Sequence, residues 1–236
     1  DVSGIVADAL VEGNETVIVT LTGTDNPGVT VAASPADTAT VNIIDSSSAT
    51  VSIAPIVDAN EAGPVDGQFM VTQSATSASD TVVSYTVAGT ATAATDYAAL
   101  TGSLTIAAGD TAATIDVTGI VADALVEGNE TIIVTLTGTD NLGITVAASP
   151  ADTATVNILD GSAANVSMAA TVDANETGPV DGQFTVTQSA TSASDTTVAY
   201  VVSGTATAGG TDYTSLSGSV IVAAGATTAT IDVTGI

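Results

Sequence analysis

The sequence contains no lysine, arginine, histidine, cysteine or tryptophan. Without cationic side chains the chain has nothing to neutralise phosphates, which excludes nucleic acid as a partner and removes attraction to an anionic membrane surface. Without cysteine it forms neither disulfides nor thiolate metal sites. The serines, threonines and acids also lack the His, Cys and Lys groups that support nucleophilic catalysis, so we expect no enzyme.

Long hydrophobic runs are absent too. No apolar stretch approaches the ~20 residues of a membrane helix, so we expect no membrane insertion. The chain carries 26 acidic residues and a net charge of −26 over 236 residues. Such acidity is typical of disorder. However, hydrophobic residues make up 45% of the chain and follow a regular pattern, which indicates a folded protein.

The sequence repeats itself at the scale of a domain. Residues 1–93 align without a gap to residues 116–208, and 17 of the 93 positions differ. A period of 115 is far longer than a solenoid unit and matches an independent domain. With boundaries at the polar stretches "SSSAT" and "GSAAN", we predict the C-terminal part of one module at 1–45, a complete module at 46–160, and the N-terminal part of a third at 161–236.

Within the complete module, apolar and small polar residues alternate with period two, and Val, Ile, Thr and Tyr dominate. Turn signals such as "AAGD" and "DNLG" separate the runs. The pattern predicts an all-β fold, an antiparallel sandwich of about seven strands at 49–57, 68–73, 81–87, 103–107, 113–119, 131–138 and 153–159. The expected core comprises Phe69, Tyr85, Leu104, Ile115, Ile132, Val134, Leu136, Val156 and Ile158.

If successive strands run antiparallel, alternate loops lie at alternate poles of the sandwich. One pole then receives the loops after the first, third and fifth strands and the end of the seventh. Eight carboxylates fall there: Asp58, Glu61, Asp66, Asp96, Asp123, Glu127, Glu130 and Asp160. The opposite pole receives only Asp80, Asp110, Asp140 and Asp152, which we interpret as turn residues.

Carboxylates from several loops at one pole are the donor set that a hard cation needs. Calcium takes six to eight oxygen ligands in irregular geometry, whereas magnesium requires stricter octahedra and zinc prefers His or Cys. Asp, Asn and Gly are also ordinary turn residues, and any single one of these acids is better explained that way. For the set as a whole, calcium is the favoured interpretation.

The stretches "GTATAATDYAALTGSLTIAAGDTAATIDVTGIVADALVEGNETIIVTL" (89–136) and "TATVNILD" (153–160) resemble the Calx-β domain, found in sodium–calcium exchangers and in many large bacterial surface proteins. The resemblance covers the whole module. It implies tandem immunoglobulin-like seven-stranded sandwiches with calcium bound at one pole. Positions matching the family's ligands are Glu61, Asp96, Asp123, Glu127, Glu130 and Asp160, then Asp8, Glu12, Glu15 and Asp45 in the first part and Glu176 and Asp212 in the last.

Two departures from the family's richest version lower the expected number of ions. Alanines flank Asp123, and the closing run of aspartates is reduced to "DGS" after Leu159 and "DSS" after Ile44. We therefore expect one or two calcium ions per module and weaker binding.

The resemblance and the near-identical tandem copies favour a calcium-stiffened structural repeat of a giant extracellular adhesin, surface fibre or sheath on a bacterial cell surface. Its partners would be neighbouring modules, head to tail, or further copies in a homopolymer. Two alternatives remain open: a calcium-sensing regulatory module, and a glycan- or surface-binding adhesive module. The first requires sub-micromolar affinity and the second exposed aromatics, of which the chain has few.

The partial modules lead to a further expectation. We expect residues 1–45 to carry the last three strands of a sandwich and residues 161–236 the first five. Neither set closes a core alone, and each leaves an apolar face and unpaired edges exposed. We therefore expect the sequence to be part of a longer array or a subunit whose end regions dock on neighbours.

Overall fold

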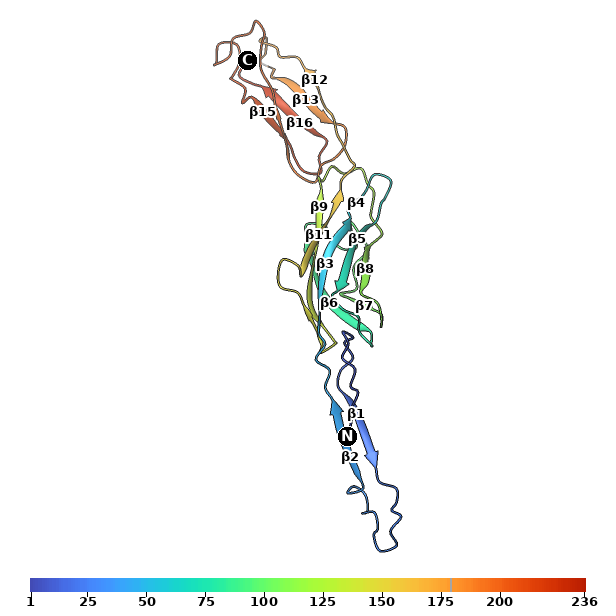
Figure 1. The fold of residues 1–236 in the computed structure, drawn as a ribbon. Coiled ribbons are helices and arrows are strands. Elements are labelled where there is room, and N and C mark those ends of the chain that lie inside the picture. Colours follow the sequence, from blue (N-terminus) through green and yellow to red (C-terminus); the bar gives the residue numbers. More distant parts are fainter. Residues whose placement is uncertain (179) are drawn as a thin grey trace.

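The structure is a computed structural model that describes residues 1–178 and 180–236. Throughout these ranges the regular elements are β-strands. They form three regions in a line: a two-stranded ribbon, a central sandwich and a third, open set of strands (Figure 1). Across the described ranges no helix has the length and apolar character needed to cross a membrane.

The central sandwich confirms the seven predicted strands to within two residues at every boundary. They are β3 (Ala49–Val57), β5 (Gly67–Gln73), β6 (Thr81–Gly89), β7 (Ser103–Ile106), β8 (Ala112–Val117), β9 (Glu130–Thr139) and β11 (Thr153–Leu159). The period-two pattern succeeds here because each strand has one face on the core and one face in solvent.

Two sheets pack face to face, with strand orders β10-β3-β5-β8 and β4-β11-β9-β6-β7. Two further short strands lie at their edges, β4 (Ala59–Asn60) and β10 (Ile144–Val146), and neither was predicted from the sequence. Both pair parallel to their neighbours, with β11 and β3 respectively, so the sandwich is not wholly antiparallel. Strands of two or three residues are too short to show an alternating pattern, which explains why they were missed.

Eight of the nine predicted core residues are buried; Leu104 is only partly buried and packs against the core from its edge. Alternate residues of β9, Ile132, Val134 and Leu136, are 0, 0 and 3% exposed, which is the burial that period two predicts for an inward face. The core is therefore mainly aliphatic, and Phe69 is its largest fully buried side chain.

Residues 1–45 form β1 (Glu15–Thr20) and β2 (Thr38–Ile43), which pair antiparallel as an isolated two-stranded sheet. The expectation of a third strand at the start of this region was wrong: among residues 1–14 the only ladder contact is an isolated bridge at Val11. In the central sandwich the equivalent strand, β8, is held by its pairing with β5. Residues 1–45 contain no counterpart of β5, so nothing holds the chain extended there.

Residues 161–236 form β12 (Val166–Val172), β13 (Gly182–Gln188), β14 (Thr196–Ala199), β15 (Ser219–Val222) and β16 (Thr228–Val233). They build a sheet β12-β13-β16 and a separate pair β14-β15. The sheet strands β12, β13 and β16 are the counterparts of β3, β5 and β8, and the pair β14 and β15 are the counterparts of β6 and β7, as the repeat predicts. Their core is small, with Val186, Val222 and Ile231 buried at its centre.

The two junctions between regions are built in the same way. Val11 of the first region forms backbone hydrogen bonds with Thr76 (N to O, 3.0 Å) and Ala78 (O to N, 2.9 Å) of the central sandwich. Its counterpart Val126 forms the same pair of bonds with Thr191 and Ala193 of the third region, at 2.9 and 3.0 Å. Each module therefore inserts a valine from its acidic loop into the opposite pole of the next one.

Candidate metal centre

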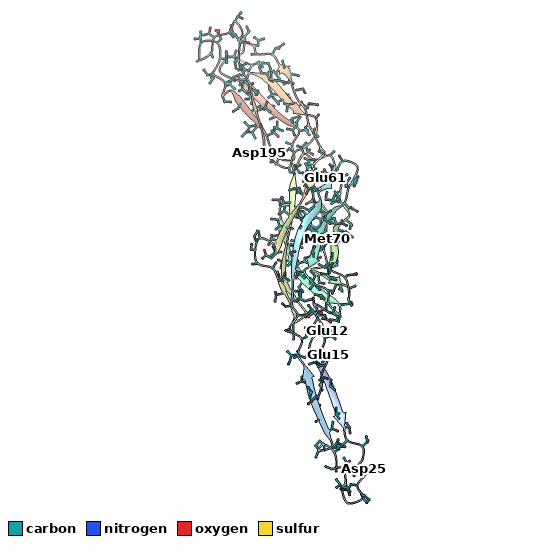
Figure 2. The ribbon with its side chains drawn as sticks, in the orientation of Figure 1. Glu12, Glu15, Asp25, Glu61, Met70 and Asp195 are labelled. Carbon is teal, nitrogen blue, oxygen red and sulfur yellow. The ribbon has the colours of Figure 1, made fainter. Side chains whose placement is uncertain are left out.

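Acidic residues from four loops of the central sandwich meet at one pole, as strand parity predicted. Glu61 follows the short strand β4, Asp96 lies in the turn between β6 and β7, and Glu130 begins β9. Figure 2 shows Glu61 at the end of the sandwich that faces the third region. This pole is therefore also the junction between two modules.

Three carboxylates approach closely enough to share one cation. Oxygen atoms of Asp96, Glu127 and Glu130 lie within 4.8 Å of one another, and all three side chains are half-buried. Asp96 is oriented by the backbone N–H of Thr92, which donates to its Oδ2 at 2.5 Å. The three donors therefore come from two loops that are distant in sequence, and the sandwich brings them together.

Buried oxygens at this pole lack partners within the protein. Glu61 is 6% exposed, and its Oε2 is buried without a hydrogen bond; the same is true of Glu130 Oε2. Burying a charged oxygen without a partner costs several kcal/mol. No cationic side chain exists anywhere in the sequence to pair with it. These oxygens fit a site whose missing partner is a cation bound from solution.

The pKa values record the same crowding. Burial, reinforced by Asp96, Glu127 and Glu61, raises the pKa of Glu130 to about 7. Burial and the neighbouring Asp160 raise the pKa of Glu61, and burial together with Asp123 raises that of Glu127. Each shift shows that the charged form is disfavoured when no cation is bound.

Asp160 has a different local role. Its Oδ2 accepts the backbone N–H groups of Glu127 and Gly128, both at 2.9 Å, and its Oδ1 accepts that of Ser162 at 2.6 Å. Burial raises its pKa, but these donors outweigh burial and lower it. Asp160 therefore ties the acidic loop to the linker that leads into the next module.

The first region repeats this clasp with Asp45. Its Oδ2 accepts the N–H groups of Glu12 and Gly13 at 2.9 and 3.1 Å, and its Oδ1 that of Ser47 at 2.7 Å. Hydrogen bonds from the backbone of Glu12 and Ser47 lower its pKa to about 2. The closing aspartate thus fixes the loop conformation even where the rest of the sandwich is absent.

Three other acids of the pole take structural positions. Asp58 Oδ1 accepts the backbone N–H of Asn157 at 2.8 Å, and Asp123 Oδ1 accepts that of Leu125 at 2.7 Å. Asp123 is exposed, yet its charge raises the pKa of Glu61 and Glu127. Asp66 is exposed, lines a pocket together with Asp116 and is not part of the three-carboxylate cluster.

The sets of the partial regions are less complete. In the first region, burial and then Glu15, Asp8 and Asp45 raise the pKa of Glu12, although Asp8, Glu12 and Glu15 are all exposed. In the third region, Asp212 Oδ2 accepts the N–H of Thr207 at 2.6 Å, and Glu176 is exposed. Within the described residues, neither set forms a three-carboxylate cluster.

Sequence reasoning missed the residues that couple the site to the next module. Val11 is 2% exposed, and Ser77 Oγ donates to its carbonyl at 3.1 Å. Ser192 contacts Val126 in the same way at 3.0 Å. The signal was present in "GIVADALVEGNET", where an apolar valine stands directly before the first glutamate at the same place in both copies.

A groove at the first junction combines acids from both modules. It has a volume of about 560 Å³ and is lined by residues that include Glu12, Asp45, Asp80 and Asp140. Asp80 and Asp140 were interpreted as turn residues, and they do accept the backbone N–H groups of Ala108 and Val82. Asp80 and Asp140 face the preceding module because the junction brings its acidic loop against this pole of the central sandwich.

The Calx-beta domain family matches residues 4–47, 58–162 and 169–236 of this chain. A search of curated proteins found no match.

Two Calx crystal structures are similar to the chain. The apo form of the Calx CBD1 domain is 22% identical over 48% of this chain and 96% of its own, with a TM-score of 0.40. The calcium-binding domain CBD12 of CALX1.1 is 18% identical over 76% and 74%, also at 0.40. A two-domain protein from Bacteroides fragilis is 9% identical over 64% and 68%, at 0.35.

Proposed function

Since this chain belongs to the Calx-beta domain family, we propose that it is a calcium-binding structural repeat, in which an ion at each acidic pole stiffens the junction to the next module. One observation carries the proposal. The oxygens Glu61 Oε2 and Glu130 Oε2 are buried and lack hydrogen-bond partners in a sequence without Lys, Arg or His. Glu130 belongs to the three-carboxylate cluster, and the charges of Asp160 and Glu127 act on Glu61.

The residues that would hold the ion in the central sandwich are Glu61, Asp96, Glu127 and Glu130, with Asp123 and Asp160 at its margin. All are oxygen donors on irregular loops except Glu130, which is the first residue of β9, and such a set suits calcium. Bound calcium would supply the positive charge that allows these carboxylates to stay ionised while buried. Asp8, Glu12, Glu15 and Asp45, and also Glu176 and Asp212, would complete equivalent sites where their modules are whole.

The ion would stiffen the junction because the proposed ligands and the residue that contacts the next module are neighbours in the sequence. Val126, which inserts into the next module, immediately precedes Glu127. Asp160 connects the same loop to the linker. An ion that fixes Glu127 and Glu130 would therefore reduce the freedom of the loop that holds the two modules together.

We place this repeat in a giant extracellular bacterial adhesin, surface fibre or sheath. The support is compositional: a strongly acidic, cysteine-free chain of near-identical modules suits an exposed polymer whose copy number matters more than the individuality of each copy. Extracellular modules bind calcium at ~10⁻⁴–10⁻³ M, so ordinary external calcium would fill the sites.

Calorimetric titration and thermal unfolding test the proposal directly. We expect calcium to raise the melting temperature of the chain and a chelator to reverse the rise. The double variant Glu127→Gln, Glu130→Gln should lose most of this response, whereas Asp110→Asn at the opposite pole should keep it.

Identical melting curves with and without chelator would contradict calcium binding. Equal losses from the two variants would mean that only total charge matters. A sub-micromolar dissociation constant would instead favour the calcium-sensing alternative.

A further inference from the structure

Two buried polar side chains bracket the loop of the central sandwich that receives the preceding module. Gln73 ends β5 and Thr81 begins β6, and residues 74–80 between them form the backbone hydrogen bonds with Val11. Gln73 is 2% exposed and Thr81 is 0% exposed. Both occupy inward positions of their strands, and neither lines the acidic groove at the junction. Their side chains therefore extend into the core beneath the loop.

Each of these side chains has an oxygen without a partner. Gln73 Oε1 and Thr81 Oγ1 are buried, and neither forms a hydrogen bond with the part of the chain that the structure describes. The amide of Gln73 is held in this orientation, because its Nε2 donates to the carbonyl of Ala75 at 2.7 Å. Turning the amide over would bring two acceptors together. Unpaired polar oxygens are costly in an aliphatic core, so we expect a hydrogen-bonding partner there.

The two oxygens belong to the same end of the core, beneath the turn between β7 and β8. The backbone N–H of Gln73 donates to the carbonyl of Thr111 at 2.7 Å, and Thr81 pairs with Ile106 at the end of β7. Only residues 107–110 separate these two attachment points. Because β5 and β6 belong to different sheets, the two side chains approach this end of the core from opposite sides.

The third region repeats the arrangement. Gln188, the counterpart of Gln73, is 4% exposed, and its Oε1 is also buried without a partner among the described residues. Its Nε2 donates to the carbonyl of Ala190 at 2.8 Å, and its backbone N–H donates to that of Thr227 at 2.8 Å. The same unpaired oxygen in two modules indicates a property of the fold rather than an accident of one loop.

We propose that each module encloses an ordered water molecule at this pole. The water donates a hydrogen bond to the glutamine Oε1 and, in the central sandwich, also contacts Thr81 Oγ1. Water fits this pair of groups because an amide oxygen only accepts, whereas a hydroxyl can donate or accept. Buried waters usually bind two to four such polar groups. The site lies at the pole opposite the carboxylate cluster, so it does not depend on calcium.

The water would support the loop that binds the preceding module. Gln73 connects the site to the carbonyl of Ala75, which directly precedes Thr76. Thr76 in turn accepts the N–H of Val11 at 3.0 Å. Without the water this end of the loop would lose an internal anchor. We therefore expect the bond from the Ala78 N–H to the carbonyl of Val11 to open more readily.

Replacing the threonine hydroxyl by a methyl group gives opposite results for a hydrated site and a dry one. If Thr81 Oγ1 has no partner, Thr81→Val removes a buried unpaired oxygen and should raise the melting temperature of the central sandwich. If a water binds it, the variant loses a hydrogen bond, and we expect a fall of about 4 °C. Thr105→Val makes the same change at an exposed position of β7 and should leave the melting temperature nearly unchanged.

Amide hydrogen exchange tests the supporting role in the full chain, with chelator present so that calcium has no influence. We expect Thr81→Val to speed exchange of the Ala78 amide at least tenfold relative to Thr105→Val. The amide of Ala193, which forms the equivalent bond at the second junction, should not change. Equal exchange of Ala78 in the two variants would overturn the supporting role.

A crystal structure of the unmodified chain tests the water itself. It should show a water within hydrogen-bond distance of Gln73 Oε1 and another at Gln188 Oε1. A dry pole, or a higher melting temperature for Thr81→Val, would overturn the proposal. A melting temperature that falls when sodium is replaced by choline would also overturn it, because a monovalent cation would then occupy the site.

Discussion

Residues 1–45 and 116–160 have nearly the same sequence and very different surroundings. Val134 is fully buried in the central sandwich, but its counterpart Val19 is 57% exposed on the ribbon. Strand pairing is the same in both, since Glu15 pairs with Ile43 as Glu130 pairs with Ile158. The comparison shows that local sequence fixes the hairpin and its register, whereas burial depends on the other five long strands.

The acids follow the same rule. Glu130 is half-buried and lies near Asp96 and Glu61, which come from loops earlier in its own module. Glu15 is exposed, because the first region has no counterparts of those two residues. The identical motif "EGNET" therefore makes a crowded site in one place and an open loop in the other.

The largest difference in stability between equivalent positions is expected when a glycine in each region is replaced by alanine. Gly89→Ala should destabilise the central sandwich by about 4 kcal/mol, because it combines a strained φ with a clash against the Thr131 backbone. Gly204→Ala has the strain without the clash, so we expect about 2 kcal/mol on the third region. Denaturant unfolding, followed by hydrogen exchange of β9 for the central sandwich and of β13 for the third region, measures the two losses of stability. Equal losses from the two variants would contradict the steric explanation.

Removing carboxylates should show that only the complete set holds calcium well. If calcium binds as proposed, concentrations of ~100 times Kd would add about 2.7 kcal/mol to the stability of the central sandwich. We expect Glu127→Gln with Glu130→Gln to remove that gain and Glu12→Gln with Glu15→Gln to leave most of it. Thermal unfolding with and without calcium compares the pairs, and a larger loss from the Glu12 and Glu15 pair would place the site in the first region.

Replacing the equivalent residues Val134 and Val19 by alanine should show that only the first of them is packed in a core. Val134→Ala leaves a cavity in a closed core, and we expect a loss of about 2 kcal/mol. Val19→Ala changes an exposed side chain, so its effect on the isolated chain should be within about 0.5 kcal/mol. Both are read from denaturant midpoints at low protein concentration, where an equal shift would mean that the ribbon is covered after all.

The last expected effect is a pH dependence of stability with opposite signs in the absence and presence of calcium. The pKa of Glu130 is about 7 in the folded state, above its ordinary value of 4.5. The folded state therefore binds more protons than the unfolded state between these values. Without calcium, stability should be full below pH 4.5 and fall as pH rises to 7.

Calcium requires the ionised form, so its stabilising effect should instead grow over the same range. Asp160 and Asp45 have lowered pKa values and change stability only below pH 4. Melting temperatures at pH 5 and 7.5, with calcium and with chelator, measure both slopes. Parallel slopes would contradict a link between Glu130 and the ion, and Glu130→Gln should flatten the curve measured in chelator.

Much of the fold was predictable because the module has one closed core and clear alternation. The seven long strands and the convergence of Glu61, Asp96, Glu127 and Glu130 at one pole followed from period and parity. The short parallel strands β4 and β10 and the partial exposure of Leu104 did not, because they depend on where sheet edges meet. The strand expected at the start of residues 1–45 failed because its pairing partner lies outside that region.

The sequence by itself determined the repeat, the all-β class and the absence of any cation to pair with the acids, since these depend only on residue identity and spacing. Only the tertiary structure decided which acids are buried and which turn residues face a neighbouring module. It also revealed that Val11 and Val126 join one module to the next. The physical reason is that burial, desolvation and interdomain contact depend on distances between segments far apart in sequence, and those distances are set by the packed sheets.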